Sequence, residues 1–251
     1  GGGMYNYNES SPSLDECTFE NNAADLFGGG MYCRYLSSPT LTGCDFIAND
    51  AVDGGGGMYN STLSDPSLTG CTFSGNSAVG NDGSPGVGVG GAMGNLTSSP
   101  TLSNCIFTTN YADQFGAGVH FGVGCNPTIS NCTINFNTSG HHGGGLYFAY
   151  FCDVTIANSI INDNDGDDRG GGLYMIEYCN AEISDTEIDS NDGGTEGGGI
   201  WCLGHCSVEI TDCSIQGNLA NAGDAILALI GCDLQSNGTN QIGSIIFHEG
   251  T

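Results

Sequence analysis

The chain of 251 residues has almost no basic side chains: it contains no lysine and only two arginines, Arg34 and Arg169. Its 28 acidic residues give a formal net charge of −26 at pH 7. A charge of this sign and size repels nucleic-acid phosphates, anionic membrane surfaces and polyanionic sugars. We therefore expect no nucleic-acid partner and expect the surface to attract cations.

Long hydrophobic runs are also missing. No apolar stretch approaches the roughly 18 residues that a membrane-spanning helix requires, so we expect no membrane span. The sequence starts inside a repeat, at Gly1, which predicts that it is a portion of a longer product.

Glycine, by contrast, is abundant, with 44 residues, and a Gly-Gly-x-aliphatic pattern returns along the whole chain. Its apolar anchors are spaced 26 or 27 residues apart, except for one step of 35, which we assign to a loop insertion at 79–88. The anchors are Met4, Met31, Met58, Met93, Val119, Leu146, Leu173, Ile200 and Ile226.

Four further positions recur along the repeats. An aliphatic residue such as Leu41 is followed by a cysteine and then by a phenylalanine or isoleucine such as Phe46. An unbroken asparagine series completes the repeat: Asn22, Asn49, Asn76, Asn110, Asn137, Asn164, Asn191 and Asn218.

Short runs of alternating residues in a long, constant repeat are typical of a solenoid of strands. The sequence therefore predicts an all-β fold: one right-handed parallel β-helix spanning 1–251, with about nine turns of 26–27 residues and three short strands per turn. Stacking at about 4.8 Å gives a rod about 43 Å long. The segment 226–251 departs from the consensus and predicts a divergent last turn.

The Gly-Gly-x-aliphatic and Phe-x-x-Asn motifs, the latter at Phe19 to Asn22 and Phe46 to Asn49 among others, resemble repeats of secreted and surface β-helix proteins. The chain is similar in this respect to the chlamydial polymorphic outer-membrane proteins. The resemblance implies export to the cell surface and a role in adhesion, and it brings no catalytic residues.

An aromatic series forms the first candidate site. The residue after each inward anchor should face outward, and stacked aromatic rings could bind glycans or a neighbouring molecule. A ladder that only stabilises the sheet is the alternative. The series comprises Tyr5, Tyr32, Tyr59, His120, Tyr147, Tyr174 and Trp201.

The acidic segment 163–168 is a candidate calcium loop, because Ca²⁺ prefers several oxygen ligands, although an ordinary solvated turn is the alternative. We expect Ca²⁺ to be the only cofactor, if there is any. The candidate ligands are Asp163, Asp165, Asp167, Asp168 and Asp192, the last from the adjacent turn.

The 13 cysteines form two ladders, with Cys33 and Cys202 outside them as buried thiols. Neighbouring turns bring Cα atoms within disulfide range, so pairs such as Cys125–Cys152 or Cys206–Cys213 are expected, although unpaired core thiols remain an alternative. One ladder contains Cys17, Cys44, Cys71, Cys105, Cys132 and Cys213, and the other Cys125, Cys152, Cys179, Cys206 and Cys232.

Glycosylation sequons occur at six asparagines, of which Asn137 belongs to the asparagine series and should be blocked. We consider Asn8, Asn60, Asn95 and Asn237 as glycosylation sites. Pairs of hydroxyl residues such as Thr40 and Thr42 also recur and resemble ice-binding solenoids, but Asp15, Glu182 and Glu209 interrupt them.

These observations favour an extracellular structural or adhesive protein that associates with itself, head-to-tail or laterally, or with surface glycans. Polysaccharide lyases and hydrolases share this kind of fold, but fold alone does not establish an activity. A lyase would need Arg34 or Arg169 as its base, and a hydrolase would need paired carboxylates in one cleft. We expect no catalytic residues, and ice binding is a second alternative.

Overall fold

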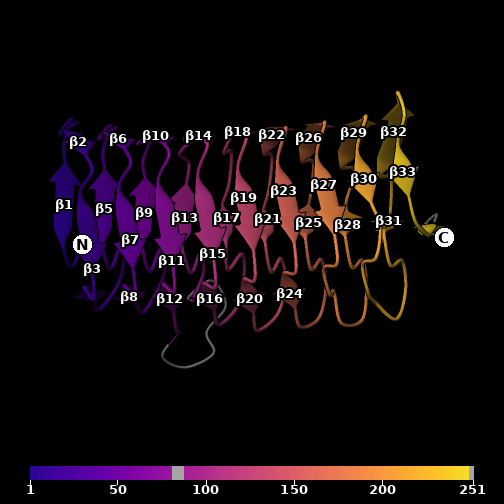
Figure 1. The fold of residues 1–251 in the computed structure, drawn as a ribbon, viewed down its shortest axis with the longest axis horizontal. Helices are drawn as coiled ribbons and strands as arrows, with labels where there is room; N and C mark the ends of the chain where they lie inside the picture. Colours follow the sequence, from indigo (N-terminus) through magenta and orange to yellow (C-terminus); the bar gives the residue numbers. More distant parts are fainter. Residues whose placement is uncertain (81–87, 249–251) are drawn as a thin grey trace.

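Each repeat forms one coil of a continuous rod in the computed structural model, which describes residues 1–80 and 88–248. The coils lie side by side along the long axis, with the two termini at opposite ends (Figure 1). Equivalent strands pair in parallel and in register, as Met4 with Met31 and Met31 with Met58. The predicted right-handed parallel β-helix of about nine turns is confirmed.

Four sheets run along the described part of the rod: each coil contributes strands to sheets A, B and C, and the first six coils also contribute one strand each to sheet D. Sheet A comprises β1 (Met4–Tyr7), β5 (Met31–Arg34), β9 (Met58–Ser61), β13 (Met93–Leu96), β17 (Val119–Phe121), β21 (Leu146–Phe148), β25 (Leu173–Ile176), β28 (Ile200–Leu203), β31 (Ile226–Leu229) and β34 (Ile245–His248). Sheet B comprises β2 (Ser13–Asp15), β6 (Thr40–Thr42), β10 (Ser67–Thr69), β14 (Thr101–Ser103), β18 (Thr128–Ser130), β22 (Asp153–Ala157), β26 (Asn180–Ser184), β29 (Ser207–Thr211) and β32 (Asp233–Asn237).

Sheet C follows sheet B in each coil. It comprises β3 (Thr18–Glu20), β7 (Asp45–Ile47), β11 (Thr72–Ser74), β15 (Ile106–Thr108), β19 (Thr133–Asn135), β23 (Ile160–Asn162), β27 (Glu187–Asp189), β30 (Ser214–Ile215) and β33 (Gln241–Ile242). Sheet D comprises β4 (Ala23–Ala24), β8 (Asp50–Ala51), β12 (Ser77–Ala78), β16 (Tyr111–Ala112), β20 (Thr138–Ser139) and β24 (Asp165–Gly166).

Sheet D adds a fourth strand to the predicted three in each of the first six coils. Its strands have two residues each, too short for the alternation of side chains that identifies a strand in a sequence. They directly follow the residues of the asparagine series, as β8 follows Asn49.

The core lies inside the coils and repeats with them. Leu41, Leu68 and Leu102 are fully buried one above the other in sheet B. In sheet C the rings of Phe46 and Phe73 stack with centroids 4.5 Å apart and planes 1° apart. Burial of each such side chain contributes about 1.5–3 kcal/mol, so stability is distributed along the rod.

The glycine runs allow the chain to enter sheet A in close contact with the next coil. Gly28 has a φ of +65°, which glycine tolerates best. A β-carbon on Gly30 would lie only 2.6 Å from the carbonyl oxygen of Gly57, so any side chain there would separate the coils.

The two predicted irregular segments differ in what can be described. Residues 81–87 of the predicted insertion at 79–88 lie outside the described residues. In the segment 226–251, β31 pairs in register with β28, and β33 leads into β34 after two residues. No helix in the described part of the chain is long and apolar enough to cross a membrane.

Candidate functional site

The outward face of sheet A is covered by the segment that precedes it in each coil. One residue of this segment forms isolated parallel bridges from coil to coil, beside the aromatic series of sheet A. This covering series comprises Phe27, Gly54, Val89, Phe115, His142, Arg169, Glu196 and Ala222. The identity of the covering residue determines whether the aromatic ring beneath it is buried.

In coils six to eight the aromatic series is buried, so the prediction of an exposed contact stripe is wrong there. Tyr174 is 4% exposed and Trp201 2%, and their rings stack 4.3 Å apart. Phe115 stacks on Tyr147 at 4.9 Å and His142 on Tyr174 at 4.7 Å. These rings form a second hydrophobic core outside the coil. We call it the closed layer.

One ion pair, between Arg169 and Glu196, lies at the edge of the closed layer. Arg169 donates from Nε to Glu196 at 2.8 Å, and its guanidinium lies 5.4 Å from the centre of the Trp201 ring. Trp201 donates from Nε1 to the same Glu196 oxygen at 3.1 Å. Arg169 therefore serves as a structural cation in this layer. Its alternative role as the base of a lyase stays a prediction.

Two histidines lie in this aromatic layer without hydrogen bonds from Nδ1. The Nδ1 atoms of His120 and His142 are both buried and lack a partner. Burial lowers the pKa of His120 to about 4, and burial together with the nearby Arg169 lowers that of His142 to about 4. Both rings are therefore neutral at pH 7 and pack as apolar rings.

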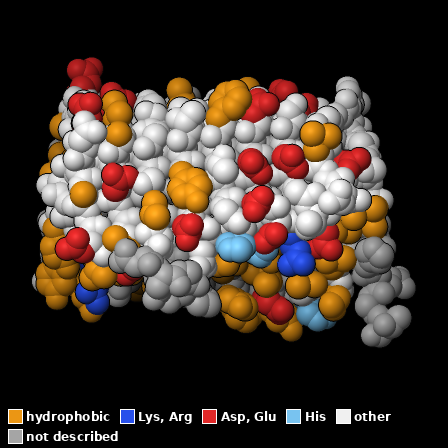
Figure 2. All heavy atoms as spheres, turned by 90° about the horizontal axis from the view of Figure 1, so that it is seen from below, with side chains coloured by type: hydrophobic (Ala, Val, Ile, Leu, Met, Phe, Trp, Pro, Cys, Tyr) orange, Lys and Arg blue, Asp and Glu red, His pale blue; other side chains and the backbone are white. Residues whose placement is uncertain are grey.

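In coils one to three the same face opens into a groove. Tyr5, Tyr32 and Tyr59 line it together with Phe27 and Arg34, and its volume is about 610 Å³. The Tyr5 and Tyr32 rings lie 5.2 Å apart, and Tyr5 is 49% exposed. Seen from below, hydrophobic side chains gather along the lower edge of the molecule (Figure 2). We call the groove lined by these residues of coils one to three the aromatic groove.

Two glycines lie beside Tyr59 at the inner end of the groove. Gly54 provides no side chain in the covering series, and Gly94 provides none in the aromatic series. The Tyr59 ring occupies the space over Gly94, where a β-carbon would lie 2.6 Å from it. Tyr59 thus forms the floor of the groove, and Tyr32 and Tyr5 remain accessible beyond it.

The asparagine series forms a continuous hydrogen-bonded ladder. Asn49 donates from Nδ2 to Asn76 Oδ1 at 2.9 Å and to the carbonyl oxygen of Phe19 at 2.8 Å. Its backbone N–H also donates to Asn76 Oδ1, at 3.0 Å. Each amide is therefore fully bonded inside the rod, which makes the ladder structural.

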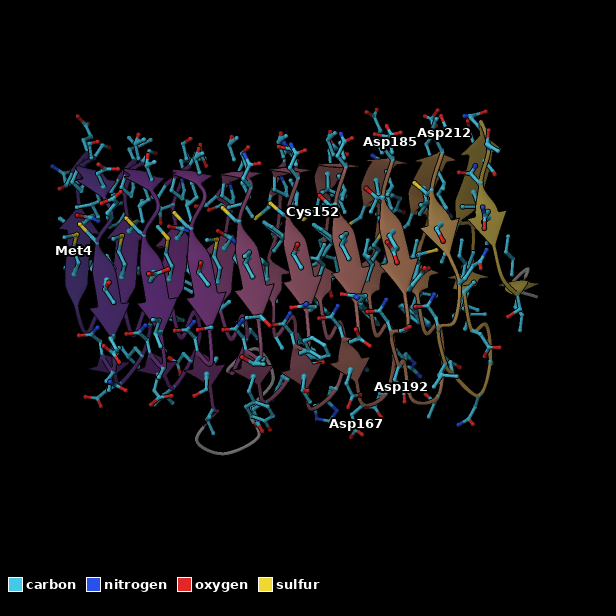
Figure 3. The ribbon with its side chains drawn as sticks, in the orientation of Figure 1. Met4, Cys152, Asp167, Asp185, Asp192 and Asp212 are labelled. Carbon is cyan, nitrogen blue, oxygen red and sulfur yellow. The ribbon has the colours of Figure 1, made fainter. Side chains whose placement is uncertain are left out.

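The cysteines are all free thiols, so the expected disulfides do not form. In register, parallel side chains keep their β-carbons about 4.8 Å apart, farther than a disulfide's usual 3.5–4.5 Å. Cys206 lies just before the five-residue strand β29 and Cys213 lies two residues after it, so the strand separates them by roughly 16 Å. The sulfur atoms recur from coil to coil, near Cys152 among others (Figure 3), and Cys33 and Cys202 are buried as predicted.

The five carboxylates of the predicted calcium site do not all meet at one point. Asp165 forms a β-bridge with Asp192, and burial together with the charges of Asp192 and Asp167 raises the pKa of the Asp165 carboxyl. Side chains of the extended segment point alternately outward and inward, so Asp163 and Asp165 are exposed around the buried Asn164. Asp168 is bonded to His141 at 2.9 Å. Asp167 and Asp192 lie at the sheet D edge, opposite Asp185 and Asp212 (Figure 3). No cluster of three or more metal-ligating side chains occurs within 1–80 and 88–248.

Burial corrects two of the four glycosylation predictions. Asn60 and Asn95 are fully buried, and Asn60 Nδ2 donates to Asn95 Oδ1 at 2.9 Å. Both side chains point inward from sheet A. A glycan attached to either of them would not fit inside the rod. Asn8 is exposed, and Asn237, also exposed, donates from Nδ2 to Glu209 at 2.9 Å.

Sheet B carries the hydroxyl residues in register on its outward face. Thr40 aligns with Ser67, and Thr101 aligns with Thr128. The array is interrupted where Glu182 aligns with Glu209, beside a hollow of about 310 Å³. Ice binding by this face stays a prediction.

One exposed feature was missed by the sequence analysis: apolar side chains at the corner between sheets A and B, including Leu36, Leu63, Phe151 and Tyr178. The sequence does contain a signal for this feature: apolar residues recur just after the sheet A strands, at positions where a turn would favour polar residues.

Comparison with known families is consistent with this geometry. The sequence matches the family described as right handed beta helix region, over residues 1–139 and 117–250. No curated protein matches the chain. Because the two matched segments span nearly the whole sequence, the chain belongs to the right-handed β-helix family.

Proposed function

We propose that this protein is an extracellular structural or adhesive β-helix that binds an uncharged glycan in its aromatic groove. The aromatic groove carries the proposal, because its volume of about 610 Å³ lies within the usual range for ligand sites. Tyrosine rings offer sugars both an apolar face and a hydroxyl group.

Charge restricts the class of glycan. With a net charge of −26, the protein repels uronate-rich or sulfated chains. Arg34 lines the groove, and its guanidinium has five N–H donors that can reach sugar hydroxyls. A neutral polysaccharide fits both features best.

The extracellular and adhesive parts of the proposal are supported by the resemblance of the repeats to those of secreted and surface β-helix proteins, including the chlamydial polymorphic outer-membrane proteins. A stiff rod with a groove along one side is suited to present a binding site away from a surface. Head-to-tail association is a further proposal, because the outer strands β1 and β34 of sheet A could extend the sheet by pairing between copies. Electron microscopy that finds only single rods would oppose it.

A glycan array tests the proposed binding. We expect Tyr32→Ala, alone and with Tyr5→Ala, to reduce binding about tenfold or more, which corresponds to about 1.4 kcal/mol. Tyr111→Ala is the matched control, since this exposed tyrosine lies on sheet D, outside the groove. Equal binding by all variants would reject the groove as the site.

The same glycans distinguish the alternative of a polysaccharide-active enzyme. If the protein only binds, incubation with neutral or acidic polysaccharides, with and without Ca²⁺, yields no new reducing or unsaturated ends. Turnover that survives Tyr32→Ala would locate catalysis elsewhere and contradict the binding proposal.

A further inference from the structure

The corner between sheets A and B exposes large apolar side chains on strained backbone. Phe151 is 58% exposed and Tyr178 49%, and their φ angles are +59° and +60°. Bulky residues rarely adopt this left-handed conformation, which has an energetic cost. Neither burial nor backbone preference accounts for aromatic residues here.

The exposed rings form an ordered stack. Phe151 and Tyr178 lie 5.4 Å apart with planes 5° apart, and Tyr178 and His205 lie 5.2 Å apart with planes 17° apart. The equivalent residue one coil earlier is Gly124, and a β-carbon there would meet nothing within 4 Å. The outer face of Phe151 is therefore open for a further group to stack on it.

Negative charge surrounds this stack. The Glu177 carboxylate extends over Gly204, with its Cδ only 2.8 Å from the position of a β-carbon on that glycine. Asp153, exposed at the start of β22, lies two residues beyond Phe151. Neither arginine of the chain serves this site, because Arg169 is paired with Glu196 and Arg34 lies in coil two.

Coil two shows the interaction that such a corner supports. There the Arg34 guanidinium lies 4.6 Å from the centre of the Tyr35 ring, and its Nη2 donates to the Tyr35 hydroxyl at 3.1 Å. Tyr35 belongs to the same corner between sheets A and B. At Phe151 and Tyr178 the rings and the carboxylates are present, and neither arginine of the chain occupies the open face of Phe151.

We propose that the Phe151–Tyr178 stack and Glu177 form a docking site for a basic, arginine-containing segment of a partner protein. A guanidinium stacks on aromatic faces and pairs with a carboxylate at the same time. Charge complementarity selects this occupant, since the overall charge of −26 attracts basic chains and repels acidic ones. The site lies outside the aromatic groove and does not depend on glycan binding.

Fluorescence anisotropy with a labelled oligo-arginine peptide tests this site, and an acidic peptide of equal length is the negative control. Phe151→Asn and Tyr178→Asn keep the net charge and suit a positive φ, so the fold should persist, as circular dichroism would verify. We expect each to weaken peptide binding about two- to fivefold. Tyr178→Phe should retain binding, and Tyr111→Asn, on sheet D, should behave as wild type.

Charge-matched variants separate docking from general attraction. Glu177→Gln should weaken binding more than Glu182→Gln, which removes the same charge from sheet B. Equal effects of these two variants, together with unchanged binding by the ring variants, would show attraction to the net charge alone and overturn the proposal.

Discussion

The two halves of the outward face of sheet A have the same repeat but opposite surfaces. In coils six to eight, Phe115, His142 and Arg169 cover the aromatic series, and Trp201 is almost inaccessible. In coils one to three, Tyr5 and Tyr32 line the aromatic groove, and Tyr5 is 49% exposed. The same repeat position is therefore part of a buried core in one region and part of an open surface in the other.

The largest difference in stability between the two regions is expected when an aromatic ring is removed from each. We expect Trp201→Ala to lower the free energy of unfolding by about 3–5 kcal/mol, because it leaves a cavity in the closed layer. Tyr5→Ala should cost less than about 1 kcal/mol, since this ring is half exposed. Urea denaturation measures both, and similar losses would show that the two halves do not differ.

A fall in pH towards 4 should lower the free energy of unfolding through the two histidines of the closed layer. The pKa values of His120 and His142 are about 4 when folded, below the value of about 6.5 for an unfolded chain. The unfolded state therefore binds protons more readily, so stability is full above pH 6.5 and declines towards pH 4, by at most about 3 kcal/mol per histidine. Urea denaturation at pH 7 and pH 4.5 of the wild type and of a His120→Phe/His142→Phe variant measures this. An equal decline in both proteins would assign the effect to other groups.

Replacement of one buried histidine should make the closed layer more stable at neutral pH. His142→Phe preserves the stacking on Tyr174 and removes an unpartnered Nδ1, so we expect stability to rise by about 1 kcal/mol. His141→Phe is the control, because His141 is exposed and bonded to Asp168. Thermal denaturation measures the stability of both variants. Equal stabilisation by His142→Phe and His141→Phe would contradict a specific effect of the buried His142 ring.

The smallest effect is expected at the rim of the closed layer. Glu196→Gln weakens the contacts to Arg169 and Trp201, and because the ion pair is partly exposed it should cost only about 0.5–1 kcal/mol. The loss should diminish in about 1 M NaCl, which screens the pair. Urea denaturation at low and high salt measures this. A larger loss at high salt would exclude an electrostatic contribution.

The repeat allowed most of the fold to be predicted, because the positions that point inward have strict requirements. Leu41, Phe46 and Asn49 each meet an equivalent residue in the next coil, so their side chains must recur. Sheet D was missed because two-residue strands have no alternation to detect. The expected disulfides failed because similar Cα spacing does not ensure that the side chains converge.

The candidate site was predicted less completely, because exposure depends on contacts that the repeat does not encode. Tyr32 and Trp201 occupy the same repeat position, yet one lines the groove and the other is buried. Asn60 and Asn95 carry glycosylation sequons, but their inward position in sheet A removes them from the surface.

By itself, then, the sequence determined the coil, its period, the asparagine ladder and the acidic field, since each follows from residue identities that recur or accumulate along the chain. The tertiary structure alone decided which aromatic rings are covered and which apolar side chains remain at the corner between sheets A and B. The physical reason is that covering residues as different as Gly54 and Arg169 occupy equivalent places, and their effect appears only when neighbouring coils pack together.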